Sequence, residues 1–132
     1  MCIRDSDIDI ALDPFPHNAG MTSLEALWMG VPVLTLADRP PVGRHGASIL
    51  TALGLDEWVA ATPEDYVAIG AVAGADPELL VPLRVGLRNR FRESPLCDAA
   101  GLARDVEAVY RELWRDWCSK TAFADDQGGD AG

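Results

Sequence analysis

The stretch Asp13–Pro32, DPFPHNAGMTSLEALWMGVP, decides the fold of this chain. Its first half is dense in Pro, Asn and Gly, which is typical of a loop. From Met21 the pattern becomes helical, and Gly30 ends the helix as a glycine beyond a helix C-terminus does. Thr22 and Ser23 are the N-cap candidates. The apolar residues that recur at helical spacing are Leu24, Leu27 and Trp28.

Strand patterns lie on both sides of this loop and helix. Residues 7–12, DIDIAL, alternate apolar and polar side chains and predict a short strand. Residues 31–36, VPVLTL, are almost wholly apolar, as in a buried parallel strand. A helix is expected over residues 46–53 and a short edge strand over 58–60. The order strand, helix, strand, helix, strand is half of a doubly wound α/β domain.

Helical patterns fill the rest of the chain. Thr62 followed by Pro63 predicts a helix start, with Thr as cap and Pro in the first turn. A second helix is expected from Asp76 to Glu93, and a last long helix begins after Asp98. The Gly-rich polar residues 119–132 predict a disordered tail.

The domain organisation inferred from these patterns has three parts. Residues 7–118 form part of a Rossmann-like α/β domain, and residues 119–132 form the tail. Residues 1–6 do not join this pattern and are interpreted as a non-native start or an artefact. Since the chain begins almost directly on a buried-looking strand, we expect it to be the C-terminal piece of a longer protein.

Composition excludes several classes of partner and site. The formal net charge of -10 argues against nucleic acid and against an anionic membrane surface. The 132 residues contain no apolar run of the roughly 18 residues that a transmembrane helix needs. The three cysteines and two histidines are not spaced as metal ligands, so no metal site is expected. Cysteine usage and the missing signal sequence favour the cytoplasm.

The loop and helix after the first strand form the candidate binding site. Ligands of open α/β sheets bind beyond the carboxyl ends of strands, where a helix N-terminus offers free N–H groups and partial positive charge. A diphosphate fits there without a basic side chain. The small Gly20 admits close approach, Thr22 and Ser23 supply hydroxyls, and a carboxylate at Glu25 can accept from both ribose hydroxyls. From spacing alone, an ordinary capped helix without a ligand is the favoured interpretation.

The whole run DPFPHNAGMTSLEALWMGVPVLTL resembles the signature of the O-linked N-acetylglucosamine transferase family, glycosyltransferase family 41. This family includes bacterial members and the plant SPINDLY proteins. The resemblance is collinear over about residues 7–118, which makes it more specific than any single motif. Further segments that resemble the family are RHGASIL at 44–50, LGL at 53–55, SPLCD at 94–98 and VYRELW at 109–114.

The resemblance implies a fold and a set of donor contacts. The fold would be GT-B, and this chain would be the C-terminal part of its second Rossmann-like domain. The donor diphosphate would bind at Gly20, Met21 and Thr22, and Glu25 would contact the ribose. Met21 stands where the family usually has Thr, so one hydroxyl contact is lost and weaker phosphate binding is expected.

Other residues are possible donor or cleft contacts: His17, Asn18, Ser23 and Arg44. A solvent-exposed loop histidine and a structural ion pair are the alternative interpretations of His17 and Arg44. Asp13 is expected to hold the loop through a turn made by its side chain. No catalytic residue is expected in this chain, because the family's catalytic groups would precede residue 7.

The function implied by the resemblance is transfer of N-acetylglucosamine from UDP-N-acetylglucosamine to Ser or Thr hydroxyls of protein acceptors. The nucleotide sugar is a substrate, and no cofactor is expected. Tetratricopeptide repeats would lie upstream, and this chain alone would be inactive. Two alternatives stay open: a GDP-fucose-dependent protein O-fucosyltransferase of the SPINDLY type, and a non-enzymatic remnant or interaction module.

Overall fold

The computed structural model describes residues 7–38 and 40–126, with side chains up to residue 120. The chain divides into two units, Met1–Cys97 and Asp98–Gly132. The proposed non-native start at 1–6 and residues 127–132 lie outside the described residues. The first unit carries the sheet and the candidate binding loop.

The first unit contains a parallel sheet whose strands follow the order β1-β2-β3. These are β1 (Ala11–Leu12), β2 (Val33–Leu36) and β3 (Val59–Ala60). Ala11 lies opposite Val33, and Thr35 lies opposite Val59. Every residue of β2 is buried, as expected for a central strand covered on both faces. The apolar run 31–36 therefore becomes the middle of the sheet.

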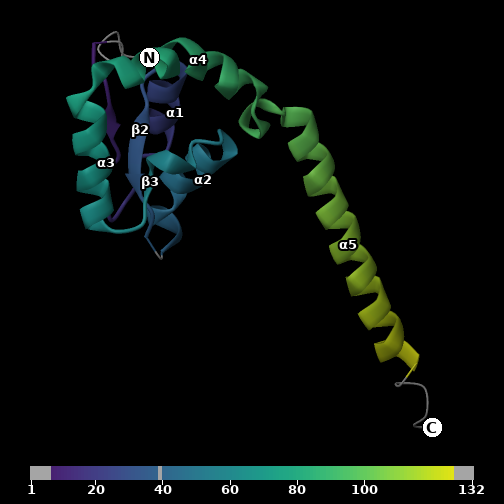
Figure 1. Ribbon diagram of the computed structural model, residues 1–132. Helices are drawn as coiled ribbons and strands as arrows, with labels where there is room; N and C mark the ends of the chain where they lie inside the picture. Colours follow the sequence, from purple (N-terminus) through teal and green to yellow (C-terminus); the bar gives the residue numbers. More distant parts are fainter. Residues whose placement is uncertain (1–6, 39, 127–132) are drawn as a thin grey trace. The chain divides into compact units, whose positions relative to one another are not determined.

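Helices cover both faces of this sheet. In Figure 1, α1 (Met21–Trp28) and α2 (His45–Ala52) lie on one face and α3 (Pro63–Ala75) lies on the other. Because α1 joins β1 to β2 and α2 joins β2 to β3, both are crossovers between parallel strands. The predicted doubly wound α/β class is confirmed. Single-turn 3-10 helices occur at Pro41–Gly43, Asp56–Trp58, Pro77–Leu79 and Pro95–Cys97.

The hydrophobic core forms where α1, α2 and α4 meet β2. Its members are mostly Leu and Val, which fill space without polar atoms to satisfy. The fully buried members include Leu27, Val31, Leu34, Leu50, Leu55 and Leu87. Trp58, 6% exposed, joins this core.

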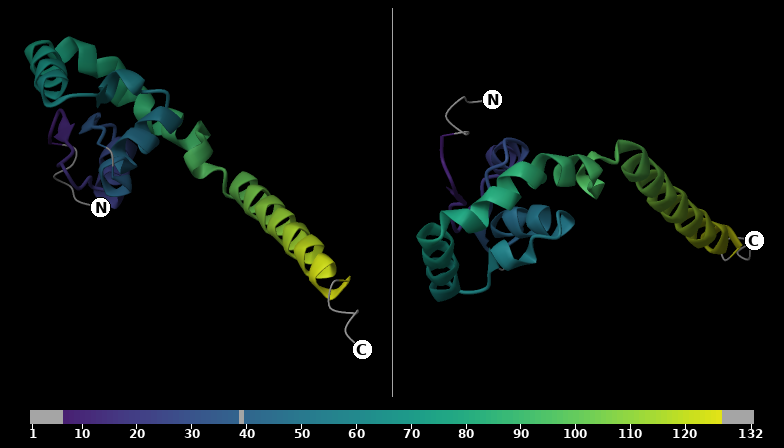
Figure 2. Two further views of the ribbon diagram at one scale, coloured as in Figure 1. Left: turned by 90° about the horizontal axis from the view of Figure 1, so that it is seen from below. Right: turned by 45° about the horizontal axis from the view of Figure 1, so that its top comes forward.

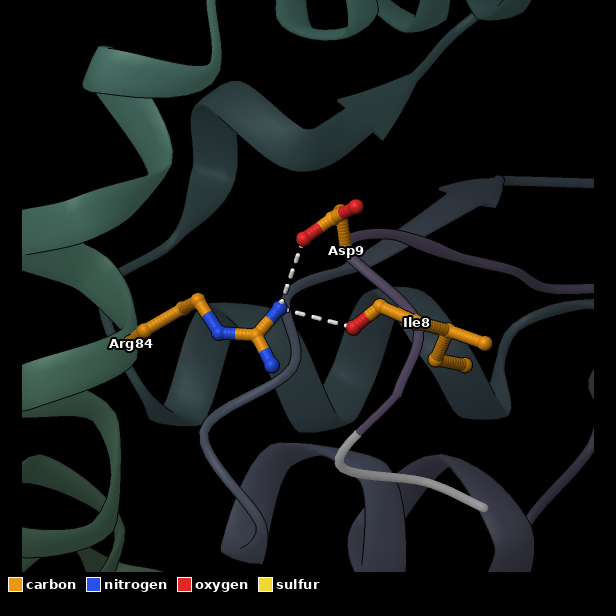
Figure 3. A network of polar contacts seen from close by, with 3 residues as sticks. All are labelled: Ile8, Asp9 and Arg84. Carbon is orange, nitrogen blue, oxygen red and sulfur yellow. Dashed lines mark hydrogen bonds and ion pairs between the residues drawn. The ribbon is translucent and has the colours of Figure 1, made fainter.

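Helix α4 (Leu80–Glu93) runs from the end of α3 past α1 and α2, as Figures 1 and 2 show. Its Arg84 Nη1 donates to the Ile8 carbonyl at 2.7 Å and lies 3.1 Å from an Asp9 carboxylate oxygen (Figure 3). This arginine therefore fixes the chain that leads into β1. It also accounts for a correction. The strand predicted over 7–12 is only Ala11–Leu12, because the Ile8 carbonyl is bonded to α4.

Two further arginines of α4 bind carbonyls at the C-terminal ends of helices. Arg88 Nε donates to the Trp28 carbonyl at 2.8 Å, and its guanidinium lies 5.6 Å from the centre of the Trp28 ring. Arg90 donates to the Gly54 carbonyl. Positive charge at helix C-termini is stabilising, since the last carbonyls lack helical partners. Helix α4 therefore closes the amino ends of the strands, opposite the binding loop.

The local turn signals were largely correct. Thr62 caps α3, accepting from the Asp65 N–H at 3.1 Å. Gly30 and Gly54 have φ of 85° and 62°, conformations that favour glycine after a helix. The helix expected over 46–53 occupies His45–Ala52.

The start of α1 differs from prediction. Gly20 is the N-cap residue and no side chain caps the helix, so Thr22 and Ser23 as N-caps were wrong. The Ser23 hydroxyl instead donates to the Ala19 carbonyl at 2.8 Å.

The second unit is the single helix α5 (Ala99–Asp126). Asp98 caps it by accepting from the Gly101 N–H at 2.7 Å, as predicted. The helix continues beyond Ser119, where the sequence indicates a disordered tail. Trp114 and Trp117 stack with ring centres 5.2 Å apart and are exposed along α5. Among the described residues no single helix is long and apolar enough to span a membrane, although the bent pair α3 and Pro77–Glu93 meets the same criteria together.

Candidate functional site

The α1 start lies at the carboxyl end of β1 and offers unused donors. The N–H groups of Met21, Thr22 and Ser23 have no hydrogen-bond partner among the described residues. A Cβ built on Gly20 meets no atom within 4 Å, so the space before this turn is open. Three N–H groups at an uncapped helix N-terminus form an anion-binding arrangement.

The buried Asp13 carboxylate holds this turn in place through hydrogen bonds. It follows β1 directly and is only 2% exposed. One oxygen accepts from the Ala19 N–H at 2.7 Å, and the other accepts from the Thr35 hydroxyl at 2.7 Å. The Ser23 hydroxyl lies 3.4 Å from the first oxygen. The side chain thus braces the loop as expected, but across six residues and to β2, which is a wider span than a local turn.

Asn18 is a second buried brace of the same loop. It is 2% exposed, its amide nitrogen donates to the Pro14 carbonyl at 3.1 Å, and its amide oxygen lies 3.4 Å from the Gly46 N–H. Its backbone N–H donates to the Val42 carbonyl at 3.1 Å. Because both amide groups serve the loop, Asn18 acts here by shaping the site. The predicted contact of Asn18 with a donor stays a prediction.

Gly46, in the first turn of α2, allows these groups to meet. A Cβ at this position would lie 2.3 Å from an Asp13 carboxylate oxygen and 2.3 Å from the Thr35 hydroxyl. Neither neighbour has room to move, because both are buried. Glycine is therefore required by close approach, and α2 begins directly behind the Asp13 carboxylate.

Tyr66 of α3 completes the bracing of the loop. Its hydroxyl donates to the Asp13 carbonyl at 3.1 Å, and its ring packs edge-to-face on Phe15, with centres 5.6 Å apart. Burial, and secondly the negative charge of Asp13, raise the pKa of Tyr66 above its ordinary value. The phenol is therefore kept neutral and able to donate.

Of the residues predicted to touch a donor, Thr22 and Ser23 line a hollow beside α1, whereas Gly20, Met21 and Glu25 are not in its wall. A hollow of about 340 Å³ lies between β1 and α1, with Ala19, Thr22 and Ser23 in its wall. Met21 is 69% exposed, whereas Glu25 is half-buried. The Glu25 carboxylate makes no hydrogen bond or ion pair with the described part of the chain. His17 is exposed on the loop.

Arg44 lies apart from this hollow. With His45, Ser48 and Thr51 it lines a separate hollow of about 620 Å³ along α2. An apolar hollow of about 540 Å³ lies between α3 and α4, and includes Trp58. Neither shares a wall residue with the hollow at α1. No group of three or more His, Cys, Asp or Glu suited to a metal ion occurs within 7–38 and 40–126.

A family model described as Glycosyl transferase family 41 matches residues 3–106 of this chain. The chain belongs to glycosyltransferase family 41. The predicted family resemblance is therefore confirmed. The match includes β1, α1 and the whole bracing network around Asp13.

Individual family 41 relatives agree with this assignment. A rice protein (Oryza sativa subsp. japonica), named a probable UDP-N-acetylglucosamine–peptide N-acetylglucosaminyltransferase SPINDLY, is 38% identical over 117 residues. That alignment covers 89% of this chain and 13% of the rice protein. A Caenorhabditis elegans UDP-N-acetylglucosamine–peptide N-acetylglucosaminyltransferase is 31% identical over 107 residues, which are 81% of this chain and 9% of that protein.

A solved family 41 structure shares the fold. A mutant of the Thermobaculum terrenum O-GlcNAc transferase superposes with a TM-score of 0.82 at 42% identity. The match covers 89% of this chain and 23% of the solved chain. The predicted fold, the C-terminal part of a GT-B Rossmann-like domain ending in long helices, is confirmed. The chain spans a small part of each relative.

Sequence reasoning missed the partners of Asp13. Thr35 is the one polar residue in the run 31–36, and a polar residue within a buried strand is a signal that a partner exists. Tyr66 offered no comparable signal, because it reaches the loop from 53 residues away.

Proposed function

We propose that the α1 start binds the diphosphate and ribose of a nucleotide-sugar donor. The protein that carries this chain would transfer N-acetylglucosamine from UDP-N-acetylglucosamine to Ser or Thr hydroxyls of protein acceptors. The observation that carries the proposal is the uncapped first turn of α1: the N–H groups of Met21, Thr22 and Ser23 are unused among the described residues, and a Cβ on Gly20 would meet no atom within 4 Å.

The electrostatics of this turn suit a diphosphate. A helix N-terminus carries about half a positive charge, and its N–H groups donate directly to phosphate oxygens. Thr22 adds an exposed hydroxyl, while Met21 contributes only its N–H. The same donors would stabilise the charge that develops on the diphosphate as it leaves the sugar.

We propose that Glu25 binds the ribose. It lies one turn into α1 from Thr22, since residues three apart share a helix face. Its carboxylate is free of partners among the described residues, so both oxygens can accept from vicinal hydroxyls. A half-buried acid without a cation is otherwise unfavourable, which a bound ribose would offset.

The relatives support the chemistry but not its details. Proteins named UDP-N-acetylglucosamine–peptide N-acetylglucosaminyltransferases resemble this chain over most of its length, yet it spans 13% of the rice relative. Transfer is therefore proposed for the whole protein, and donor binding for this chain. We assign no catalytic residue here. A protein acceptor, upstream tetratricopeptide repeats and a cytoplasmic location belong to the same proposal.

Calorimetric titration of the chain with UDP and with GDP tests donor binding. We expect UDP to bind, and Glu25→Ala to weaken binding by roughly tenfold through lost charged hydrogen bonds. Glu64→Ala is the matched control, since it removes one exposed glutamate from α3. No heat of binding at millimolar UDP, or equal loss in both variants, would contradict the proposal. Preferential binding of GDP would favour the fucosyltransferase alternative.

A further inference from the structure

The Asp13 carboxylate is a buried charge without a cation. It is 2% exposed, and none of the ion pairs in the described part of the chain includes it. Its charge is stabilised by the Ala19 N–H and the Thr35 hydroxyl, both at 2.7 Å. Burying a carboxylate is costly unless every oxygen is well bonded, so an aspartate at this position depends on both of these hydrogen bonds.

The carboxylate connects three elements that meet at the binding loop. Ala19 is the residue before the N-cap of α1, and Thr35 lies within the central strand β2. Gly46 of α2 leaves no room for a Cβ beside the same carboxylate oxygen. A single side chain therefore sets where α1 begins relative to the sheet.

From this arrangement we infer that Asp13 is the positioning residue of the donor site, holding the first turn of α1 in its anion-binding geometry before the donor arrives. The inference rests on the proposed function of that turn. N–H groups stabilise a diphosphate strongly only if they are already aimed at it, because reorienting them on binding costs free energy. The Asp13 side chain is 2% exposed and both its oxygens are bonded within the protein, so it would act through the loop and not by binding the donor.

Two pairs of variants separate positioning from general stability. Asp13→Ala removes both hydrogen bonds, whereas Asp13→Asn keeps the shape and the acceptor for Ala19. Thr35→Val removes one bond and keeps the volume, so it remains informative if Asp13→Ala fails to fold. Thr51→Val is its control, since Thr51 also donates to an aspartate, Asp56, at 2.7 Å but lies on the exposed part of α2.

The test is titration of the folded chain with UDP and with inorganic pyrophosphate, together with amide hydrogen exchange. We expect Asp13→Ala and Thr35→Val to weaken both ligands by roughly tenfold, with Asp13→Asn within about threefold of wild type. Exchange should accelerate at Ala19, whose N–H donates to Asp13, and at Leu24, whose N–H donates to the Gly20 carbonyl, and not in α3. The control Thr51→Val should change neither affinity.

The failures of the two proposals are distinguishable. If wild type binds UDP and Asp13→Ala and Thr35→Val bind it equally well, the positioning role is wrong and the donor site stands. If wild type binds neither UDP nor pyrophosphate, the donor site is wrong. Uniform acceleration of exchange across α1 and α3 would reduce Asp13 to a residue of general stability and overturn the inference.

Discussion

Replacing Gly46 with alanine tests the packing between the α2 start and the Asp13 carboxylate. Helix propensity alone predicts that Gly→Ala within a helix stabilises by about 0.5–1 kcal/mol. At Gly46 the new Cβ would lie 2.3 Å from both an Asp13 oxygen and the Thr35 hydroxyl. That is about 1 Å inside van der Waals contact, so the Asp13–Thr35 hydrogen bond must be distorted or broken.

We therefore expect Gly46→Ala to destabilise the protein, opposite to the change that helix propensity predicts. Overpacking of a buried site costs about 1–3 kcal/mol, and a lost buried hydrogen bond adds about 1 kcal/mol. Gly46→Ala should lower the free energy of unfolding by about 1–3 kcal/mol after the propensity gain. Urea unfolding followed by circular dichroism measures this difference.

The control is Gly86→Ala in α4, an exposed helical position where a Cβ meets nothing within 4 Å. It should raise the free energy of unfolding by about 0.5–1 kcal/mol. If Gly46→Ala is as stable as wild type, or as stable as Gly86→Ala, the close approach of α2 to Asp13 is not real. The bracing account would then fail.

Three further predictions concern the scaffold around the site. Arg88→Ala should lower the free energy of unfolding in urea by about 1 kcal/mol, since it removes the bond to the Trp28 carbonyl and the contact with the Trp28 ring. Arg92→Ala should lower it less, since Arg92 donates to Asn89 on the same helix. Thr62→Ala should lower the free energy of unfolding by about 1 kcal/mol because α3 loses its N-cap, and Thr62→Ser should restore that stability. Burial raises the pKa of Tyr66, so the stability that Tyr66 contributes is complete below the ordinary pKa of 10.0 and is lost as the pH rises through the pKa of the folded state. Tyr66→Phe should therefore flatten the fall in the free energy of unfolding above pH 10.0. An unchanged fall would contradict the raised pKa.

The elements with local signals were predicted from the sequence. The apolar run 31–36 contains the buried β2, and Gly30 adopts the positive φ expected after a helix. Thr62 caps α3 because the Thr-Pro-Glu-Asp pattern satisfies the first turn without help from distant residues. In each case the physical cause lies within a few residues.

The elements that differed depend on distant partners. The strand at 7–12 is shorter because Arg84, 76 residues further on, binds the Ile8 carbonyl. Spacing rules do not contain this contact, since it arises from how α4 packs against the chain before β1.

The sequence predicted where the candidate site lies but not which side chains support it. The α1 start lies where the strand–loop–helix pattern indicates. The sequence did not reveal that Thr35 donates a hydrogen bond to Asp13 behind this turn, because their separation of 22 residues carries no periodic signal. Buried polar groups find their partners through the tertiary fold.

Amide chemical-shift mapping of the chain with UDP tests the central claim most directly. A diphosphate at the α1 start must perturb the N–H groups that donate to it. The account predicts the largest saturable changes at residues 20–23, with a smaller change at Glu25 and none along α3. Absence of saturable changes at millimolar UDP, or changes centred on the hollow around Arg44 and His45, would contradict it.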